Sequence, residues 1–296
     1  MGDVYTLQTL KSLPENPPHY AVLGFPVRHS LSPQLQEAAF HKTGCPGQYI
    51  RFEIAPEDLP EAVAQMKEMN FPGWNCTVPH KFGMFALVDE VTETAARMKA
   101  VNTVVNRNGR LSGYNTDGNG WVRAMRQDFS IPITGLRIMI LGAGGGAGQA
   151  LARQAVFEKC GRLVLVNRTV EKIQQLQREI APDSLSEVKA IAWDQETIQA
   201  ELRETELLVN CTSQGLKDSE PPVLTADILH PGLLVYDTIY RPSPTKLLAE
   251  AVKAGARTAN GLSMLLHQGA LAFEIWTGRE APITEMWEAL KAAATL

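Results

Sequence analysis

The chain contains little cysteine and no closely spaced cysteine pair. Four of its 296 residues are cysteines, and no two of them form a Cys-x-x-Cys arrangement. The sequence therefore gives no sign of a zinc finger or a dithiol redox motif. Widely separated cysteines are typical of reduced thiols in the cytoplasm. His29, His80 and His267 also lack the spacing of metal ligands, so we predict no metal site.

The chain also lacks a basic excess and long apolar runs. It has 28 lysine and arginine residues against 32 aspartate and glutamate residues, for a net charge of −4. A nucleic-acid binder is expected to carry a basic surface, and a membrane span needs about 20 apolar residues in succession. The first residues show no signal-peptide pattern. We therefore expect a cytoplasmic monomer or homodimer that binds a small molecule and neither nucleic acid nor membrane.

Apolar strand-like runs alternate with helical patterns after an N-terminal extension expected over residues 1–18. Ser32 and Pro33 predict a helix start, with serine as N-cap and proline at the first helical position. The alternation predicts an α/β protein built from two βα domains with mainly parallel sheets. Expected strands are 20–24, 49–54, 73–78, 136–141, 163–166, 207–210 and 234–237, with a hairpin near 101–105 and 109–112. Expected helices are 7–13, 34–43, 56–69, one that begins at Lys81, 149–159, 170–180, 264–276 and 283–294.

A glycine-rich loop between an expected strand and an expected helix predicts a dinucleotide site. It follows the pattern Gly-x-Gly-x-x-Ala, formed by Gly142, Gly144 and Ala147. The first glycine permits a tight turn, the second lets the backbone approach a pyrophosphate, and the small third residue lets helix and strand pack closely. The alternative is a loop that only connects the two elements.

The residues after the next expected strand indicate which dinucleotide binds. A carboxylate there would favour NAD, but this chain has Asn167, Arg168 and Thr169, with Lys172 one turn later. Two cations and neutral donors suit a 2′-phosphate, so we predict NADP. The alternative is that Arg168 and Lys172 form a solvated helix start.

Lys81 and Asp117 are the candidate proton-transfer groups. Lys81 follows the apolar segment 73–79, and a lysine in such surroundings can donate or accept a proton. Reduction of a ketone by hydride needs a proton donor for the developing alkoxide. Taken alone, Lys81 would be a surface charge and Asp117 a turn or helix-cap residue. Together with a dinucleotide loop they predict a catalytic pair, in which either could carry the proton.

Several polar residues could bind the substrate of such a pair. Ser30 and Ser32 would share one side of an extended segment, and two hydroxyl donors suit a carboxylate. Asn102 and Gln268 add neutral groups that fit a polyol. The alternatives are a capping role for Ser32 and a satisfied helix residue for Gln268.

The chain closely resembles the shikimate dehydrogenase family through nine short motifs in one order. The match extends over nearly all of the chain after residue 18, so the resemblance is specific. The motifs are His-Ser-Leu-Ser-Pro at 29–33, Asn-Cys-Thr-Val-Pro-His-Lys at 75–81, Ala-Val-Asn-Thr at 100–103, Asn-Thr-Asp-Gly at 115–118, Gly-Ala-Gly-Gly-Gly at 142–146, Asn-Arg-Thr at 167–169, Asn-Cys-Thr-Ser at 210–213, Asp-Thr-Ile-Tyr at 237–240 and Gly-Leu-Ser-Met-Leu at 261–265.

The resemblance implies reversible NADPH-dependent reduction of 3-dehydroshikimate to shikimate, a step of aromatic amino-acid biosynthesis. It implies a substrate domain over 19–116, to which helices 262–296 return, a Rossmann-type NADP domain over 117–261, and an active site in the cleft between them. By resemblance, Lys81 and Asp117 are the catalytic pair. The implied substrate residues are Ser30, Ser32, Thr77, Asn102, Tyr240 and Gln268. The implied cofactor residues are Gly142, Ala143, Gly144, Gly145, Gly146, Asn167, Arg168, Thr169, Lys172, Thr212, Thr238 and Gly261, with Thr238 and Gly261 beside the nicotinamide.

Three positions depart from the usual family pattern. Lys172 stands where arginine is usual and keeps the charge without the planar fork. Thr238 replaces an apolar residue beside the nicotinamide, and Cys76 often corresponds to valine. Two alternatives stay open: a paralogue that acts on quinate or a related cyclic hydroxy acid, and a non-catalytic ligand sensor on the same fold. The presence of Lys81 and Asp117 weighs against the sensor.

Overall fold

Two units, each with its own sheet and core, make up the chain. The computed structural model describes residues 4–217 and 219–295. Unit 1 comprises residues 1–120 and 265–296, and unit 2 comprises residues 121–264. The boundaries fall inside two helices, α6 (Asp117–Phe129) and α11 (Leu262–Thr277).

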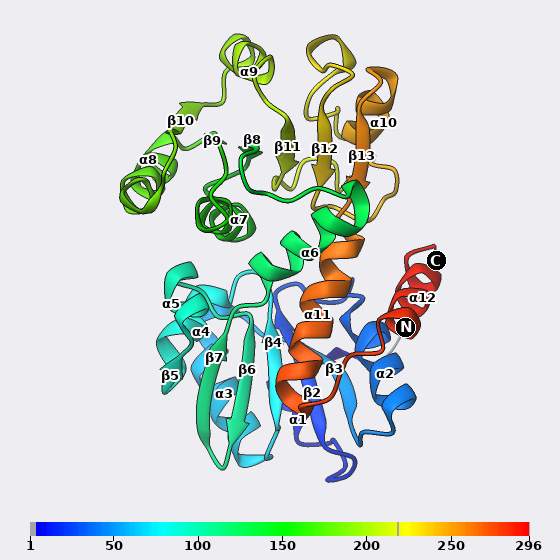
Figure 1. Ribbon diagram of the computed structural model, residues 1–296. Helices are drawn as coiled ribbons and strands as arrows, with labels where there is room; N and C mark the ends of the chain where they lie inside the picture. The colour runs from blue at the N-terminus through cyan, green and yellow to red at the C-terminus, as the bar shows by residue number, and fades with distance from the viewer. Residues whose placement is uncertain (1–3, 218, 296) are drawn as a thin grey trace. The chain divides into compact units, whose positions relative to one another are not determined.

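Unit 1 is built on a seven-stranded sheet with the order β1-β3-β2-β4-β6-β7-β5 (Figure 1). β6 pairs antiparallel with β4 and β7, and the other described pairs are parallel. The strands are β1 (Val4–Tyr5), β2 (His19–Gly24), β3 (Gln48–Glu53), β4 (Gly73–Cys76), β5 (Glu90–Val91), β6 (Thr103–Arg107) and β7 (Arg110–Tyr114). The helices are α1 (Leu7–Leu10), α2 (Ser32–Thr43), the 3-10 helix η1 (Pro56–Asp58), α3 (Leu59–Glu68), α4 (Lys81–Leu87), α5 (Glu93–Met98) and α12 (Ile283–Ala294), with parts of α6 and α11.

Apolar side chains cover both faces of the sheet of unit 1. On one face, Phe52 and Trp74 are fully buried among side chains of α1, α3, α4 and α5. On the other face, the ring of Tyr20 lies 4.9 Å from Phe40 of α2 and 5.0 Å from Trp276 of α11, measured between centroids. Trp276 also donates its indole N–H to the carbonyl of Val104 at 2.9 Å. α2 and α12 lie side by side in Figure 1. Burial on both faces holds the strand ends, and the loops that follow them, in fixed positions.

Unit 2 is a six-stranded parallel sheet with the order β10-β9-β8-β11-β12-β13. This is the strand order of a Rossmann fold, in which β8 and β11 meet at the point where the order reverses. The strands are β8 (Arg137–Leu141), β9 (Arg162–Asn167), β10 (Val188–Ala192), β11 (Leu207–Asn210), β12 (Leu234–Asp237) and β13 (Arg257–Asn260). The helices are α7 (Gly146–Phe157), α8 (Val170–Ile180), η2 (Ala181–Asp183), α9 (Gln195–Leu202), η3 (Ala226–Ile228) and α10 (Lys246–Lys253). Separate apolar clusters on the two faces of the sheet form its core.

The structure confirms most predicted elements and corrects two helices. α8, α12, β11 and β12 have the predicted bounds. The single helix predicted over 56–69 is wrong, because η1 precedes an α-helix that begins at Leu59, with Pro60 in its first turn. The helix predicted over 149–159 begins earlier, at Gly146, and ends at Phe157, because Lys159 takes a left-handed backbone conformation. β1, β5, β10, β13, α5, α6, α9, α10, η2 and η3 were not predicted.

Several expectations concern the chain as a whole. Within the described ranges, no helix combines the length and the apolar character needed to span a membrane. All four cysteines are free thiols. In the same part of the chain, no cluster of three or more His, Cys, Asp and Glu residues has the geometry of a metal site. Residues 1–3 of the predicted N-terminal extension lie outside the described ranges.

Candidate functional site

Three chain segments meet at one edge of the sheet of unit 1. β2 and β4 are parallel neighbours, so the loops that follow them leave from the same edge, and Thr77 donates its backbone N–H to Leu23 at 2.8 Å. β7 runs in the same direction as β4, because each is antiparallel to β6. Asn102, just before β6, is bonded there to both neighbours: its N–H donates to Tyr114 at 3.0 Å, and its carbonyl accepts from Cys76 at 2.8 Å. The sheet therefore gathers the predicted site residues 30–32, 77–81, 102 and 117 at its carboxyl edge.

Lys81 and Asp117 form an ion pair at this edge. Lys81 is the first residue of α4, Asp117 is the first residue of α6, and Nζ of Lys81 donates to Oδ2 of Asp117 at 2.7 Å. Their side chains are 16% and 6% exposed, so the pair is largely removed from water while part of the lysine stays accessible. A charged pair interacts more strongly where water is largely excluded. The structure thus brings together the two residues predicted as the proton-transfer pair.

The second oxygen of Asp117 is fixed by Asn102. Nδ2 of Asn102 donates to Oδ1 of Asp117 at 3.0 Å and to Oγ1 of Thr116 at 2.9 Å. Oδ1 of Asn102 accepts from the backbone N–H of Thr116 at 2.8 Å and from Oγ1 of Thr103 at 2.9 Å. All four residues are buried. Asn102 was predicted to bind substrate, and that role stays a prediction; in this structure its amide orients the carboxylate.

Behind Asn102, further polar side chains extend the network, and none of their side-chain contacts was predicted. Nδ2 of Asn75 donates to the carbonyl of Asn102 at 3.0 Å and to Oγ1 of Thr103 at 2.9 Å. Oδ1 of Asn75 accepts from the hydroxyl of Tyr49 at 2.6 Å. A buried polar network whose members are bonded to one another is rigid, so it holds the orientation of Asp117. The only sequence signal was the polar Asn75 inside an otherwise apolar strand.

Ser30 and Ser32 are adjacent, but not for the reason predicted. Oγ of Ser30 donates to Oγ of Ser32 at 3.1 Å and accepts from the backbone N–H of Ser32 at 3.3 Å. The segment is turned rather than extended, since the residue between them has ψ near 3°. The predicted N-cap role of Ser32 is also wrong: Leu31 is the N-cap of α2 and makes no side-chain cap. Ser30 instead bonds the N–H of Ser32, the first residue of that helix.

The other predicted substrate residues are distributed over both units. Thr77 lies against Gly24, where an added Cβ would come within 2.6 Å of the methyl carbon of Thr77. Gln268, on α11, donates to the carbonyl of Leu265 at 2.9 Å and lies against Gly120. Tyr240 is partly buried and belongs to unit 2, whereas Ser30, Ser32, Thr77, Asn102 and Gln268 belong to unit 1.

The glycine loop of unit 2 forms a cradle that side chains would fill. Gly142 has φ of +76°, and a Cβ there would lie 2.9 Å from the backbone of Cys211 and Thr212. At Gly144, a Cβ would lie 2.8 Å from Nδ2 of Asn167. The loop leads from β8 into α7, whose first-turn N–H groups suit an anion. These residues fit a dinucleotide, because they leave the backbone open to the close approach of a pyrophosphate.

Helix α7 also packs closely on the glycine loop at Gly148, the residue after Ala147. A Cβ at Gly148 would lie 2.4 Å from the carbonyl oxygen of Gly142. Ala143 and Gly146 complete the predicted loop, and Gly145 is the N-cap of α7. The packing role assigned to Ala147 stays a prediction.

Arg168 lies between two side chains that the sequence interpretation missed. One of its terminal nitrogens donates to Oε1 of Gln214 at 3.2 Å, and its guanidinium carbon lies 6.0 Å from the ring centroid of Trp193. Arg168 is exposed, as is Lys172 in the first turn of α8. Thr169 is the N-cap of that helix. The predicted phosphate-binding residues thus lie together after β9 with their cations open to solvent.

A buried carboxylate, Asp237, organises the loops that follow β11 and β12. It accepts from Asn210 at 2.9 Å, from the backbone N–H of Ile239 at 3.1 Å and from Thr245 at 2.6 Å. Burial raises the pKa of Asp237, and these three hydrogen bonds oppose the rise. Asn210 also accepts the hydroxyl of Thr212 at 2.8 Å. The network thus connects Thr212, a predicted cofactor residue, to the carboxyl ends of β11 and β12.

Thr238 and Gly261, predicted to lie beside the nicotinamide, are in contact. A Cβ at Gly261 would lie 2.1 Å from the carbonyl oxygen of Thr238, so only glycine fits there. The hydroxyl of Thr238 donates to the carbonyl of Asn210 at 2.8 Å. Burial also raises the pKa of the neighbouring Cys211 thiol, which stays protonated near neutral pH.

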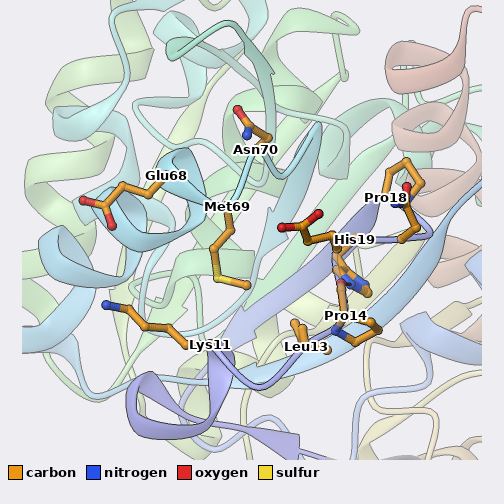
Figure 2. Close-up of a pocket in the computed structure, with 10 residues that line it drawn as sticks. Lys11, Leu13, Pro14, Pro18, His19, Glu68, Met69 and Asn70 are labelled. Carbon is orange, nitrogen blue, oxygen red and sulfur yellow. Dashed lines mark hydrogen bonds between the residues drawn. The ribbon is translucent and has the colours of Figure 1, made fainter.

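A cavity of about 660 Å³ lies elsewhere in unit 1, against the N-terminal segment (Figure 2). It opens near His19, at the amino end of β2, whereas the predicted substrate residues follow the carboxyl ends of the strands. None of the predicted site residues lines it. Its lining residues include Lys11, Leu13, Pro14, Glu68, Met69 and Asn70.

Three family models match separate parts of the chain. The shikimate dehydrogenase substrate-binding domain matches residues 22–104, the shikimate/quinate 5-dehydrogenase model matches residues 124–230, and the shikimate 5′-dehydrogenase C-terminal domain matches residues 261–291. The shikimate dehydrogenase (NADP(+)) of Methanopyrus kandleri is 42% identical over 271 residues, which cover 91% of this chain and 93% of that protein. The chain belongs to the shikimate dehydrogenase family.

Solved structures of family members share its fold. Shikimate 5-dehydrogenase of Thermus thermophilus, in complex with NADP(H) and shikimate, is 36% identical, with a TM-score of 0.83 over 94% of this chain and all of that chain. Quinate dehydrogenase of Corynebacterium glutamicum, in complex with NAD, is 26% identical, with a TM-score of 0.82 over 93% of this chain and 99% of that chain. The predicted family membership and the predicted two-domain α/β fold with a Rossmann unit are confirmed.

Proposed function

We propose that this protein is an NADP-dependent shikimate dehydrogenase. It reduces 3-dehydroshikimate reversibly to shikimate in aromatic amino-acid biosynthesis. The observation that carries the proposal is the largely buried Lys81–Asp117 pair, 2.7 Å apart, at the edge where the serine pair and Asn102 are gathered. The curated relative from Methanopyrus kandleri carries the same activity in its name. We assign substrate binding chiefly to unit 1 and NADP binding to unit 2.

The bound cofactor supplies the hydride. Gly142, Gly144 and the first turn of α7 bind its pyrophosphate, because the glycines add no side chains to the loop and the first turn of an α-helix has backbone N–H groups without partners in the helix. Arg168, Lys172 and Thr169 bind the 2′-phosphate through charge and hydrogen bonds. Thr212, Thr238 and Gly261 line the nicotinamide end, where the buried Asp237 holds their loops.

Lys81 and Asp117 donate and accept the proton of the substrate hydroxyl. In the reducing direction the developing alkoxide takes a proton, and Nζ of Lys81 carries one that faces the carboxylate of Asp117. In the oxidising direction the pair accepts that proton. Asn102 donates to the other oxygen of Asp117, so the carboxylate keeps one orientation through both directions. This arrangement places acid and base function on the same two side chains.

The remaining predicted residues bind the substrate. The hydroxyls of Ser30 and Ser32, 3.1 Å apart, donate to its carboxylate. Thr77, Asn102, Tyr240 and Gln268 bind its hydroxyl groups. Because the substrate offers one carboxylate and a ring of hydroxyls, one hydroxyl pair and several neutral donors match its polar groups.

A two-by-two assay tests the function. Purified protein is given shikimate or quinate with NADP⁺ or NAD⁺, and reduction of the cofactor is followed by absorbance. We expect shikimate with NADP⁺ to give the largest kcat/KM. A larger kcat/KM for quinate with NAD⁺ would show a quinate-type paralogue instead, and absence of turnover with ligand binding would show a sensor.

We also propose a cytoplasmic location and a monomeric or homodimeric state. Cys76 and Cys160 are buried free thiols, and burial raises the pKa of Cys160 to about 11, so both are unreactive side chains suited to a reducing compartment. Cell fractionation and analytical ultracentrifugation test the two statements. A secreted protein or a larger assembly would contradict them.

A further inference from the structure

A buried arginine behind the serine pair has no role in the function proposed so far. Arg51 lies in β3, in register with Val22 of β2 and Val4 of β1, and it is 4% exposed. A strand inside a sheet normally carries apolar residues at such positions, because burial of a guanidinium is costly unless it is hydrogen-bonded. Its contacts are therefore informative.

Three hydrogen bonds join Arg51 to the segment that carries the serine hydroxyls and to the helix that follows it. Nε and Nη2 of Arg51 donate to the carbonyl oxygen of Ser30 at 3.0 and 2.8 Å. Nη2 also donates to Oε1 of Gln34, on the first turns of α2, at 3.2 Å. The guanidinium thus clamps both the loop before α2 and the start of the helix. Ser30 in turn bonds Ser32 through its hydroxyl.

The clamp fixes a geometry that the serines alone would not hold. Ser30 is only partly buried and follows the exposed residues Arg28 and His29; its N–H donates to the carbonyl of Val27 at 3.0 Å, and its own carbonyl is held by Arg51. Two donors of a planar guanidinium on one carbonyl oxygen set the position of the Ser30 peptide, and the third contact fixes it relative to α2. The same group brings a positive charge close to the two hydroxyls that the proposed function assigns to the substrate carboxylate.

We propose that Arg51 is a positioning residue for the carboxylate subsite of Ser30 and Ser32, and that it tunes affinity for the carboxylate of the substrate. The proposal rests on the proposed function, because that function supplies the carboxylate. Arg51 acts through Ser30 and not by direct contact with the reacting atoms. It therefore affects substrate binding and leaves proton transfer by Lys81 and Asp117 intact.

The test compares Arg51→Gln and Arg51→Lys with Arg28→Gln as a matched control. Arg28 lies on the same loop, but its side chain is 64% exposed, and it contacts Glu53. We expect Arg51→Gln to raise the KM for shikimate about tenfold or more, as for loss of a charge-assisted hydrogen bond. Arg51→Lys keeps the charge without the fork and should give a smaller rise. For both variants, kcat and the KM for NADP⁺ should stay close to wild type, as should every constant of Arg28→Gln.

Binding measurements with an uncharged analogue separate positioning of the subsite from general damage. We expect Arg51→Gln to weaken calorimetric binding of shikimate more than binding of its methyl ester. A KM for shikimate unchanged in Arg51→Gln, or an equal rise in the KM for NADP⁺, would overturn the proposal. Should Arg51→Gln fail to fold, the wild type still tests it, since equal affinity for shikimate and its methyl ester would exclude a carboxylate subsite. A wild type that does not turn over shikimate would overturn the proposed function itself, and this role of Arg51 with it.

Discussion

The two units differ in the parts of the chain that we propose for binding. Unit 2 offers mainly backbone, and unit 1 offers mainly side chains. Unit 2 has a six-stranded all-parallel sheet, and we propose that it binds the dinucleotide chiefly with the backbone of its glycine loop, where a Cβ added at Gly142 or Gly144 would meet backbone or side-chain atoms within 3 Å. Unit 1 has a mixed seven-stranded sheet and gathers side chains from several loops at one edge. A pyrophosphate is bound by backbone N–H groups that point toward it, whereas proton transfer needs ionisable side chains in contact.

The difference predicts which constants each unit controls. Substitutions in the Lys81 network should lower kcat. Substitutions around the glycine loop or at Arg168 should weaken cofactor binding or lower the stability of unit 2. The following experiments test whether turnover depends on unit 1 and cofactor binding on unit 2.

Lys81→Ala should have the largest effect. Removal of the proton donor should lower kcat by about 100-fold or more, with little change in the KM for NADP⁺. Lys42→Ala serves as control, because Lys42 is an exposed lysine near the end of α2 opposite Ser32, and it pairs with Glu285. Steady-state kinetics give both constants. Normal turnover of Lys81→Ala would remove the residue from the mechanism.

Gly148→Ala should destabilise unit 2. Its Cβ would lie 2.4 Å from the carbonyl oxygen of Gly142, and backbone cannot move aside as a flexible side chain would. We expect the free energy of unfolding to fall by about 1–3 kcal/mol in chemical denaturation, together with weaker NADP⁺ binding. Gly145→Ala is the control, since its Cβ would come no closer than 3.4 Å. Equal losses in the two variants would argue against close packing at Gly148.

Arg168→Ala should change cofactor preference. Loss of a charge-assisted bond to the 2′-phosphate should raise the KM for NADP⁺ about tenfold and leave the KM for NAD⁺ nearly unchanged. Arg178→Ala, at an exposed position on the last turn of α8, should leave both constants unchanged. Equal increases for the two cofactors in Arg168→Ala would exclude the phosphate role.

The smallest predicted effect concerns His80, next to Lys81. It is 2% exposed, its Nε2 lies 2.9 Å from the carbonyl oxygen of Ile54, and burial lowers its pKa from 6.5. The unfolded chain therefore binds the proton more tightly than the folded one. Its stability contribution is complete above about pH 6.5 and is lost as the pH falls toward the lower folded value, by at most about 1.4 kcal/mol per pH unit.

His80→Gln provides the comparison for this pH effect. Glutamine can still bond the carbonyl of Ile54 and does not titrate. Denaturation at pH 7.5 and 5.5 should show a smaller acid destabilisation in His80→Gln than in wild type. The same pH dependence in both would assign it to other groups.

Sequence patterns predicted some periodic elements with correct bounds, but they missed the amphipathic helices α6 and α10 and the edge strands of unit 2. α8 and α12 carry an apolar face at helical spacing, and β11 and β12 are short apolar runs, so their bounds were predicted correctly. β10 and β13 are the edge strands of unit 2 and mix polar with apolar residues, which hides them from such patterns.

Whether a site residue could be predicted also depended on the local sequence pattern around it. The glycine loop, Lys81 and Asp117 belong to contiguous motifs, and each could be named from the sequence. Arg51 could not, because a charged residue in a strand suggests a solvent-facing position. β1 pairs with the outer side of β3 and makes β3 an interior strand, and that pairing joins residues 47 positions apart. The capping role expected of Ser32 failed because α2 begins at Ser32 itself, so that Leu31 is the N-cap, and the hydroxyl of Ser30 bonds the N–H of Ser32.

The double variant Lys81→Ala/Arg168→Ala tests most directly whether unit 1 and unit 2 have separate roles in proton transfer and cofactor binding. The quantity to measure is kcat/KM for NADP⁺ at saturating shikimate, in wild type, both single variants and the double variant. Independent sites without shared partners have additive free-energy effects, so the account predicts that the two losses multiply. A double variant no worse than the poorer single variant would contradict it.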